Sequence, residues 1–162
     1  MMRLSRSRSD VREVQHERCK KGTMAVAKAC RRRTDGARIL LVEDNEDFRL
    51  LMNLVLQDAG YAVDSATCAE DALGMMEQQC YRLVVSDYSL PGYSGLWLLS
   101  QAFARHLMAP EAALIITGDP EAPGIDKVVP VVSKPVDFER LLPQIRAALE
   151  NSPQILASNV AA

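Results

Sequence analysis

Residues 83–95 read LVVSDYSLPGYSG, and this stretch decides how the rest of the chain is interpreted. An apolar run of strand-forming residues ends on a single carboxylate, Asp87. The proline and two glycines that follow predict a loop before a helical pattern begins at Leu96. Asp87 is therefore expected at the carboxyl end of a buried strand, which in an open parallel α/β sheet is the edge where ligands bind.

Three other apolar runs also end on polar residues. They predict strands at 39–42, 114–116 and about 128–133, followed by Glu43 and Asp44, by Thr117 and by Lys134, respectively. A fifth, partly polar strand over 61–65 suits the edge of a sheet. Any one of these strand ends could be a structural cap, but the whole set is hard to explain as ordinary loop residues.

Helical periodicity separates the strands. Apolar residues at three- and four-residue steps predict helices over 48–59, 69–76, 98–106 and 137–149. Gly60 is expected to end the first helix and Asp137 to cap the last, in which Pro143 should produce a kink or delay the start. Strands that alternate with helices predict a doubly wound parallel α/β sheet with right-handed crossovers.

Charge is distributed unevenly along the chain. Residues 1–36 contain 11 Lys and Arg against 4 Asp and Glu, a net charge of +7, whereas the remaining 126 residues contain 8 against 17, a net charge of −9. We divide the chain into a basic arm (1–36), a domain (37–150) and a short tail (151–162). The arm has few large apolar side chains, so it is expected to be disordered or a frayed helix. Met24 is an alternative translation start.

The composition also disfavours several classes of protein. The four cysteines are 11, 38 and 12 residues apart, which fits neither a CxxC metal site nor a dense disulfide framework, and we expect reduced thiols in a cytoplasmic protein. No apolar run approaches the ~20 residues of a membrane span, and no export signal precedes the domain. The basic arm could attract nucleic acid, but a solvated tail is the favoured interpretation.

The strand ends predict a chemistry if the strands at 39–42 and 83–86 are neighbours. Glu43, Asp44 and Asp87 would then converge, and their repulsion should lead the site to hold a proton or to bind a hard divalent cation. Oxygen ligands favour magnesium or manganese over zinc. Lys134 and the Thr117 hydroxyl could hold a tetrahedral oxyanion, which indicates phosphoryl chemistry with Asp87 as the nucleophile that forms an aspartyl phosphate.

Short sequences at these strand ends resemble a known family. They are LVEDN (41–45), VVSDYSLP (84–91) with Ser94-Gly95, ITG (116–118) and SKP (133–135). Together they resemble the receiver domain of two-component response regulators, from Arg38 to about Glu150. The resemblance implies the flavodoxin-like strand order 2-1-3-4-5. It also implies a stand-alone phosphorylation switch or phosphorelay carrier, and not an enzyme that turns over a substrate.

The resemblance assigns the phosphoacceptor and the metal ligands. Asp87 would take a phosphoryl group from the phosphohistidine of a sensor histidine kinase or of a histidine phosphotransfer protein, and the switch would then act on an unidentified downstream protein. Magnesium would be held by Asp44, Asp87 and the backbone carbonyl of Ser89, with Glu43 acting through water. No membrane partner is implied.

The remaining roles follow from the same resemblance. Lys134 would pair with the phosphoryl oxygens, and its bond to Pro135 would be cis. Thr117 would move inward to hydrogen-bond the phosphoryl group. Two departures affect signal propagation: only 17 positions separate Thr117 from Lys134, so the helix usual there is expected to be shortened or absent, and Val131 stands where the family tends to have an aromatic residue.

Three other functions fit the sequence less well. A phosphatase of the haloacid dehalogenase type needs a second Asp two residues after its nucleophile, where this chain has Ser89. A receiver fold that binds partners without phosphorylation is disfavoured by the intact set of Glu43, Asp44, Asp87, Thr117 and Lys134. A nucleic-acid binder is disfavoured because the chain has no helix-turn-helix pattern and no basic pattern interleaved with aromatics.

Overall fold

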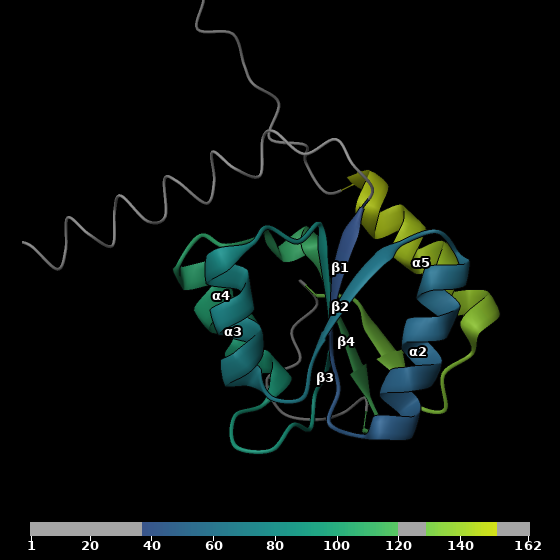
Figure 1. Cartoon of the computed structure of the whole chain (residues 1–162), viewed down its shortest axis with the longest axis horizontal. Coiled ribbons are helices and arrows are strands. Elements are labelled where there is room, and N and C mark those ends of the chain that lie inside the picture. The colour runs from purple at the N-terminus through teal and green to yellow at the C-terminus, as the bar shows by residue number, and fades with distance from the viewer. Residues whose placement is uncertain (1–36, 120–128, 152–162) are drawn as a thin grey trace, which may run out of the picture.

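The computed structural model describes residues 37–119 and 129–151, and it has a central sheet between two layers of helices (Figure 1). The strands are β1 (Arg38–Val42), β2 (Ala62–Ala66), β3 (Leu83–Asp87), β4 (Ala113–Thr117) and β5 (Val131–Ser133). The helices are α2 (Glu46–Asp58), α3 (Ala69–Gln78), α4 (Gly95–Ala104) and α5 (Phe138–Asn151), with a short 3₁₀ helix, η1 (Pro110–Ala112). The predictions for the basic arm, for the helix between Thr117 and Lys134 and for the tail concern 1–36, 120–128 and 152–162, outside the described residues.

The sheet order is β2-β1-β3-β4-β5, and every neighbouring pair is parallel, as the resemblance implied. The register aligns the carboxyl ends of the strands: Val42 pairs with Ser86, and Asp87 pairs with Ile116. One step further, Thr117 pairs with Ser133. The residues that end or follow β1, β3, β4 and β5 therefore leave the sheet at one edge.

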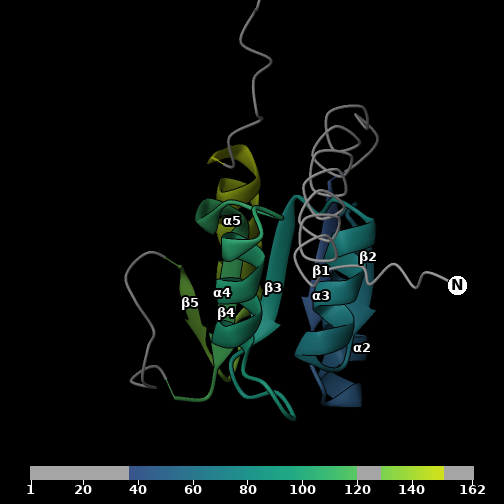
Figure 2. The same cartoon turned by 90° about the vertical axis from the view of Figure 1, so that its left-hand side faces the viewer.

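Helices cover both faces of the sheet, which explains why the strands are continuously apolar. Helices α2 and α5 pack on one face, against a buried cluster that includes Ile39, Leu41 and Val85. Helices α3 and α4 pack on the other face, with Leu40 and Val84. Figure 2 shows α3 and α4 in front of the sheet and α5 behind it. Full burial of each such side chain contributes about 1.5–3 kcal/mol, so the two clusters hold the strands in register.

Most predicted elements are found, with small shifts. The edge strand β2 begins and ends one residue later than predicted. Strand β5 begins only at Val131, because Pro130 has no N–H to donate to the ladder and contributes only its carbonyl, which accepts from Ile115 N–H at 2.9 Å. Gly60 has φ +91° and follows α2, as predicted.

The last helix differs from the prediction in one respect. Asp137 caps it as expected, since its carboxylate accepts from the Glu139 N–H at 3.0 Å. The helix begins directly afterwards at Phe138 and includes Pro143, so the proline does not delay the start. Among the described helices, none has the length and apolar character that a membrane crossing requires.

Candidate functional site

Three carboxylates meet at the carboxyl edge of the sheet. Glu43 and Asp44 follow β1, and Asp87 is the last residue of β3. Each offers a carboxylate oxygen, and these three oxygens lie within 4.8 Å of one another. Glu43 and Asp87 are buried, with exposed fractions of 1% and 7%, whereas Asp44 is exposed to solvent. The predicted convergence of the two strand ends is therefore present.

Lys134 joins two of these carboxylates from the end of β5. Its ammonium nitrogen lies 2.7 Å from Asp87 Oδ2 and 3.0 Å from Glu43 Oε2. The Lys134 N–H donates to the Thr117 carbonyl at 2.7 Å, so the backbone of the lysine is held against the end of β4. The Lys134–Pro135 peptide bond is cis, as the resemblance implied.

The electrostatic environment changes two pKa values. Burial raises the pKa of Glu43, and repulsion from Asp87 adds to this effect against the hydrogen bond from Lys134. Partial burial alone would lower the pKa of Lys134, but its bonds to Asp87 and Glu43 together outweigh burial and raise it. The cluster thus has three carboxylates and one ammonium, which pairs with two of them, and the surplus of negative charge on oxygen donors fits a hard divalent cation.

The backbone around Asp87 is closely packed. The Ser89 N–H donates to Asp87 Oδ1 at 3.2 Å, which leaves Oδ2 for Lys134. A Cβ added to Gly95, the first residue of α4, would lie 2.1 Å from the Asp87 carbonyl oxygen and 2.7 Å from Ser86 Oγ. Only glycine lets α4 start this close to the strand that carries Asp87, so Gly95 does more than shape the loop.

Thr117 lies at the same edge but is engaged in its own loop. Its side chain is buried, with 1% exposed. The hydroxyl donates to the Asp119 carbonyl and accepts from the Asp119 N–H, both at 3.0 Å. Of the predicted site residues, the contacts therefore join Glu43, Asp44, Asp87 and Lys134. Ser89 contributes its N–H, and the Thr117 hydroxyl bonds to Asp119.

Two residues of α2 support the site and were missed by the sequence analysis. The ring of Phe48 lies under Lys134, with 4.8 Å from the ammonium nitrogen to the ring centroid. Arg49 Nη1 donates to the carbonyls of Glu43 and Asp44 at 2.9 and 3.2 Å and so holds the loop that carries both acids. Helical periodicity assigned Phe48 to the core, and no sequence pattern distinguishes Arg49 from an arginine pointing into solvent.

Comparison with known proteins then identifies the family. Residues 39–146 match the family described as the response regulator receiver domain. The chain belongs to this family. Receiver domains are parts of two-component systems and are signalling modules, not enzymes that turn over a substrate. Glu43, Asp44 and Asp87 thus form an acidic cluster in a receiver domain, and this is consistent with phosphorylation-dependent signalling.

Individual relatives agree with this assignment. The response regulator RppA of Synechocystis sp. is 35% identical over 122 residues, which cover 72% of this chain and 52% of RppA. Among solved structures, the receiver domain of the hybrid histidine kinase CckA is 31% identical with a TM-score of 0.59, covering 69% of this chain and 98% of that one. TrrA of Thermotoga maritima, solved in complex with Mg²⁺–BeF, is 27% identical with a TM-score of 0.61, covering 68% and 97%. The chain spans about half the length of the curated relatives that it matches.

Proposed function

We propose that this receiver domain is a signalling switch in which Asp87 is phosphorylated. The observation that carries the proposal is the placement of Lys134, whose ammonium group bridges Asp87 and Glu43 inside the acidic cluster. A nucleophilic carboxylate, a cation beside it and further oxygen ligands are the parts that phosphoryl transfer to an aspartate requires.

The proposed reaction starts from a phosphohistidine of a sensor histidine kinase or of a histidine phosphotransfer protein. A carboxylate oxygen of Asp87 attacks the phosphorus and forms a P–O bond while the P–N bond breaks. The departing imidazole keeps the electron pair of that bond and takes up a proton. Lys134 contacts Asp87 Oδ2 at 2.7 Å and is placed to pair with a phosphoryl oxygen, while the Ser89 N–H holds Oδ1.

A divalent cation completes the proposed site. Asp44, Asp87 and the backbone carbonyl of Ser89 would hold Mg²⁺ or Mn²⁺, with Glu43 acting through water; TrrA, crystallised with Mg²⁺–BeF, is a precedent in the family. When bound, the cation supplies positive charge for the phosphoryl oxygens. The residues fit this role because the acids carry more negative charge than Lys134 balances.

The output of the proposed switch depends on Thr117. Its hydroxyl would exchange the Asp119 backbone for a phosphoryl oxygen and move the β4–β5 loop with it. A downstream protein would read this change, and neither a nucleic acid nor a membrane is proposed as a partner. A cytoplasmic location is proposed because the free thiol of Cys68 suits a reducing compartment.

The test is intact-mass analysis of the full chain after incubation with Mg²⁺ and a small phosphodonor such as acetyl phosphate. We expect the protein to gain one phosphoryl group, the Asp87→Asn variant to gain none, and chelation of Mg²⁺ to prevent the gain. Asp58→Asn, which changes an exposed acid at the end of α2, is the matched control and should be phosphorylated normally.

Two results would reject this function. Phosphorylation of Asp87→Asn to the same extent would place the phosphoryl group elsewhere. Hydrolysis of a phosphomonoester over many turnovers would show an enzyme instead of a switch.

A further inference from the structure

The outward face of α2 is apolar. Leu50, Leu51 and Leu54 have exposed fractions of 59%, 45% and 66%. With Tyr93 they are the exposed large hydrophobic residues in the part of the chain that the structure describes. We call these three side chains the leucine face. Exposed apolar side chains that lie together on one helix and are bordered by polar residues often mark a surface that binds another segment or protein.

Acidic residues stand at both ends of the leucine face. Glu46 and Asp47 occupy the first turn of α2, and Asp58 is its last residue. The last turn has no basic residue, so Asp58 lies unfavourably at the negative end of the helix dipole. The guanidinium of Arg49 is already bound to backbone carbonyls of the β1–α2 loop. The surface therefore has the order acidic, apolar, acidic.

The basic arm contains a segment with the same order, in which the charges have the opposite sign. Residues 20–33 read KKGTMAVAKACRRR, in which Lys20 and Lys21 precede a mostly apolar stretch that ends at Arg31–Arg33. Lys20 and Arg32 are twelve positions apart, and so are Glu46 and Asp58. Twelve positions of α-helix span ~18 Å, a distance that a segment of the same length can match.

The arm joins the domain close to the end of α2. Arg38, the first residue of β1, pairs with Ala62, the first residue of β2. Ala37 packs against the same apolar cluster as Tyr61, which lies between α2 and β2. Arg33 lies four positions before Ala37, and these four steps of chain reach at most ~14 Å, so the arginines can approach the Asp58 end of α2.

Other occupants fit this surface less well. Two α2 helices from two copies of the chain would bring acids against acids in either orientation, because both ends of the leucine face are acidic. The tail at residues 152–162 contains no charged residue, so it has nothing to pair with Glu46, Asp47 or Asp58. The arm has both the apolar centre and the cations.

We propose that residues 20–33 bind the leucine face of α2 in the same chain, with Arg31–Arg33 at Asp58 and Lys20 and Lys21 at Glu46 and Asp47. This contact does not depend on phosphorylation of Asp87. The first turn of α2 carries Phe48, whose ring lies under Lys134, so the arm covers a surface beside the acidic cluster. The arm therefore competes with any protein that approaches this surface, and high salt weakens the contact of the arm with α2.

Paramagnetic NMR of the full chain tests this contact. A spin label is placed on Cys30, next to Arg31, in a chain in which Cys19, Cys68 and Cys80 are replaced by serine. We expect the label to broaden the amide signals of residues 50–58 strongly, to leave those of α4 on the opposite face of the sheet sharp, and to lose its effect in high salt. A second sample mixes spin-labelled chain that has no ¹⁵N with ¹⁵N-enriched chain that carries no spin label. This sample should show no broadening, because the contact is intramolecular.

Charge reversal supplies a matched pair of variants. Replacing Arg31, Arg32 and Arg33 by glutamate should abolish the broadening on α2. Replacing Arg3, Arg6 and Arg8 by glutamate makes the same change of charge in the arm and should leave the broadening in place. A second, independent change, Leu50→Ser with Leu54→Ser, alters only exposed side chains and should also abolish it.

Three outcomes would overturn the proposal. Broadening that is absent, or spread evenly over the domain, would leave the leucine face open to a separate protein. Broadening in the mixed sample would show that a second copy binds it. Equal effects of the two arginine triples would show that only general attraction between the basic arm and the acidic domain is present.

Discussion

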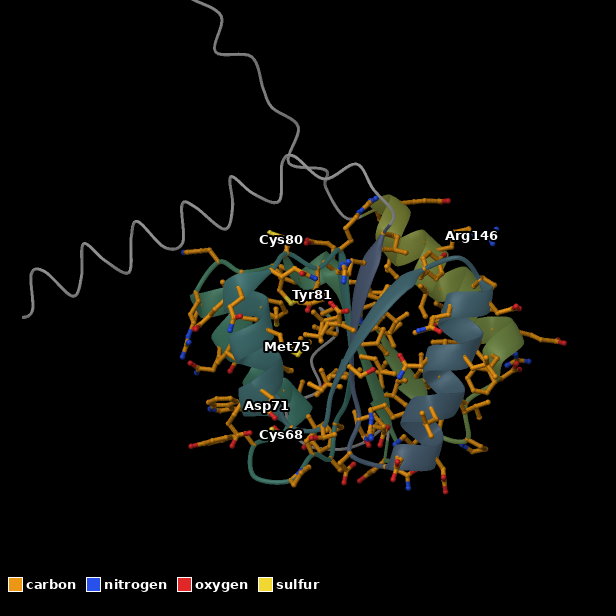
Figure 3. The ribbon with its side chains drawn as sticks, in the orientation of Figure 1. Cys68, Asp71, Met75, Cys80, Tyr81 and Arg146 are labelled. Atoms are coloured by element: carbon orange, nitrogen blue, oxygen red, sulfur yellow. The ribbon has the colours of Figure 1, made fainter. Side chains whose placement is uncertain are left out.

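Two regions of this domain bind carboxylates through networks of polar side chains, and they balance the negative charge in different ways. In β2, Asp64 accepts from Arg38 Nη1 at 3.0 Å through both oxygens, from Gln79 Nε2 at 2.9 Å and from Tyr81 Oη at 3.0 Å. One negative charge thus has one cation and two neutral donors. Tyr81 lies two residues before the start of β3, and its side chain is labelled in Figure 3.

The acidic cluster at the other region has the reverse balance. Glu43, Asp44 and Asp87 lie together, and the ammonium group of Lys134 pairs with Glu43 and Asp87. At Asp64, burial and the hydrogen bond to the carboxylate raise the pKa of Tyr81, so its hydroxyl stays a donor. The two kinds of acid differ in how completely they are paired: a carboxylate with all its partners stabilises the fold, whereas a group of acids with too few partners leaves charge available for a ligand.

The largest expected change in stability comes from replacing Asp64, the fully paired acid. Asp64→Ala should lower the free energy of unfolding by about 2–3 kcal/mol, because Tyr81 Oη and the Gln79 amide lose their acceptor while partly or fully buried. Urea unfolding followed by circular dichroism measures this change. The exposed control Asp58→Ala should change the same quantity by no more than about 0.5 kcal/mol. Equal effects of the two substitutions would contradict the role assigned to Asp64.

The next effect comes from supplying the charge that the acidic cluster lacks. At ten times its dissociation constant, Mg²⁺ should raise the free energy of unfolding by about 1.4 kcal/mol. Asp64→Ala should keep this increment although it is less stable, and Asp44→Asn should lose most of it. Unfolding with Mg²⁺ and with chelator measures both. The same increment in Asp44→Asn would show that the cation binds somewhere else.

The sequence predicts the acidic cluster better than it predicts the Asp64 network. Strands that are apolar on both faces indicate a parallel sheet, and parallel topology brings the residues after strand ends to one edge, so Glu43, Asp87 and Lys134 could be grouped without coordinates. Asp64 lies inside a strand that was correctly expected at the sheet edge. Its partners come from β1, from the residue after α3 and from the segment before β3, and no periodic pattern links them.

Other details depended on packing at short range. Pro130 shortens β5 because it lacks an N–H, an effect that strand propensity did not capture. Gly95 was expected only to break the chain into a loop, whereas the structure shows that a Cβ there would collide with the Asp87 carbonyl. The bonds from Arg49 to the β1–α2 loop depend on one side-chain conformation, which residue spacing does not determine.

Removing one acid from the cluster should change the free energy of unfolding in the opposite direction to removing Asp64. Without divalent cations, Asp44→Asn should raise the free energy of unfolding by about 1 kcal/mol or less, because it relieves repulsion between carboxylates within 4.8 Å of one another in a partly hydrated site. Asp47→Asn, on the neighbouring first turn of α2, should lower the free energy of unfolding slightly, because an acid at this end of the helix interacts favourably with the helix dipole. Urea unfolding in chelator compares the two. A loss of stability in Asp44→Asn would mean that this acid, too, is structurally paired.

The smallest expected effect is a dependence on pH that belongs to Glu43. Its pKa in the folded protein is raised above the usual 4.5, mainly by burial, so the folded state holds the proton more tightly than the unfolded chain does. Glu43 therefore contributes most to stability below about pH 4.5, and this contribution is lost as the pH rises through the folded-state pKa. Glu43→Gln cannot titrate and lacks this dependence.

The free energy of unfolding of the unmodified protein minus that of Glu43→Gln should consequently fall between about pH 4.5 and neutral pH in chelator. Glu46→Gln, an exposed acid on α2, is the control for general effects of charge. A difference that rises with pH would mean that the bond to Lys134 outweighs burial and that Glu43 resembles Asp64 after all. A falling difference would show that the domain keeps this buried acid at a cost in stability, as expected where a site is built to receive a cation.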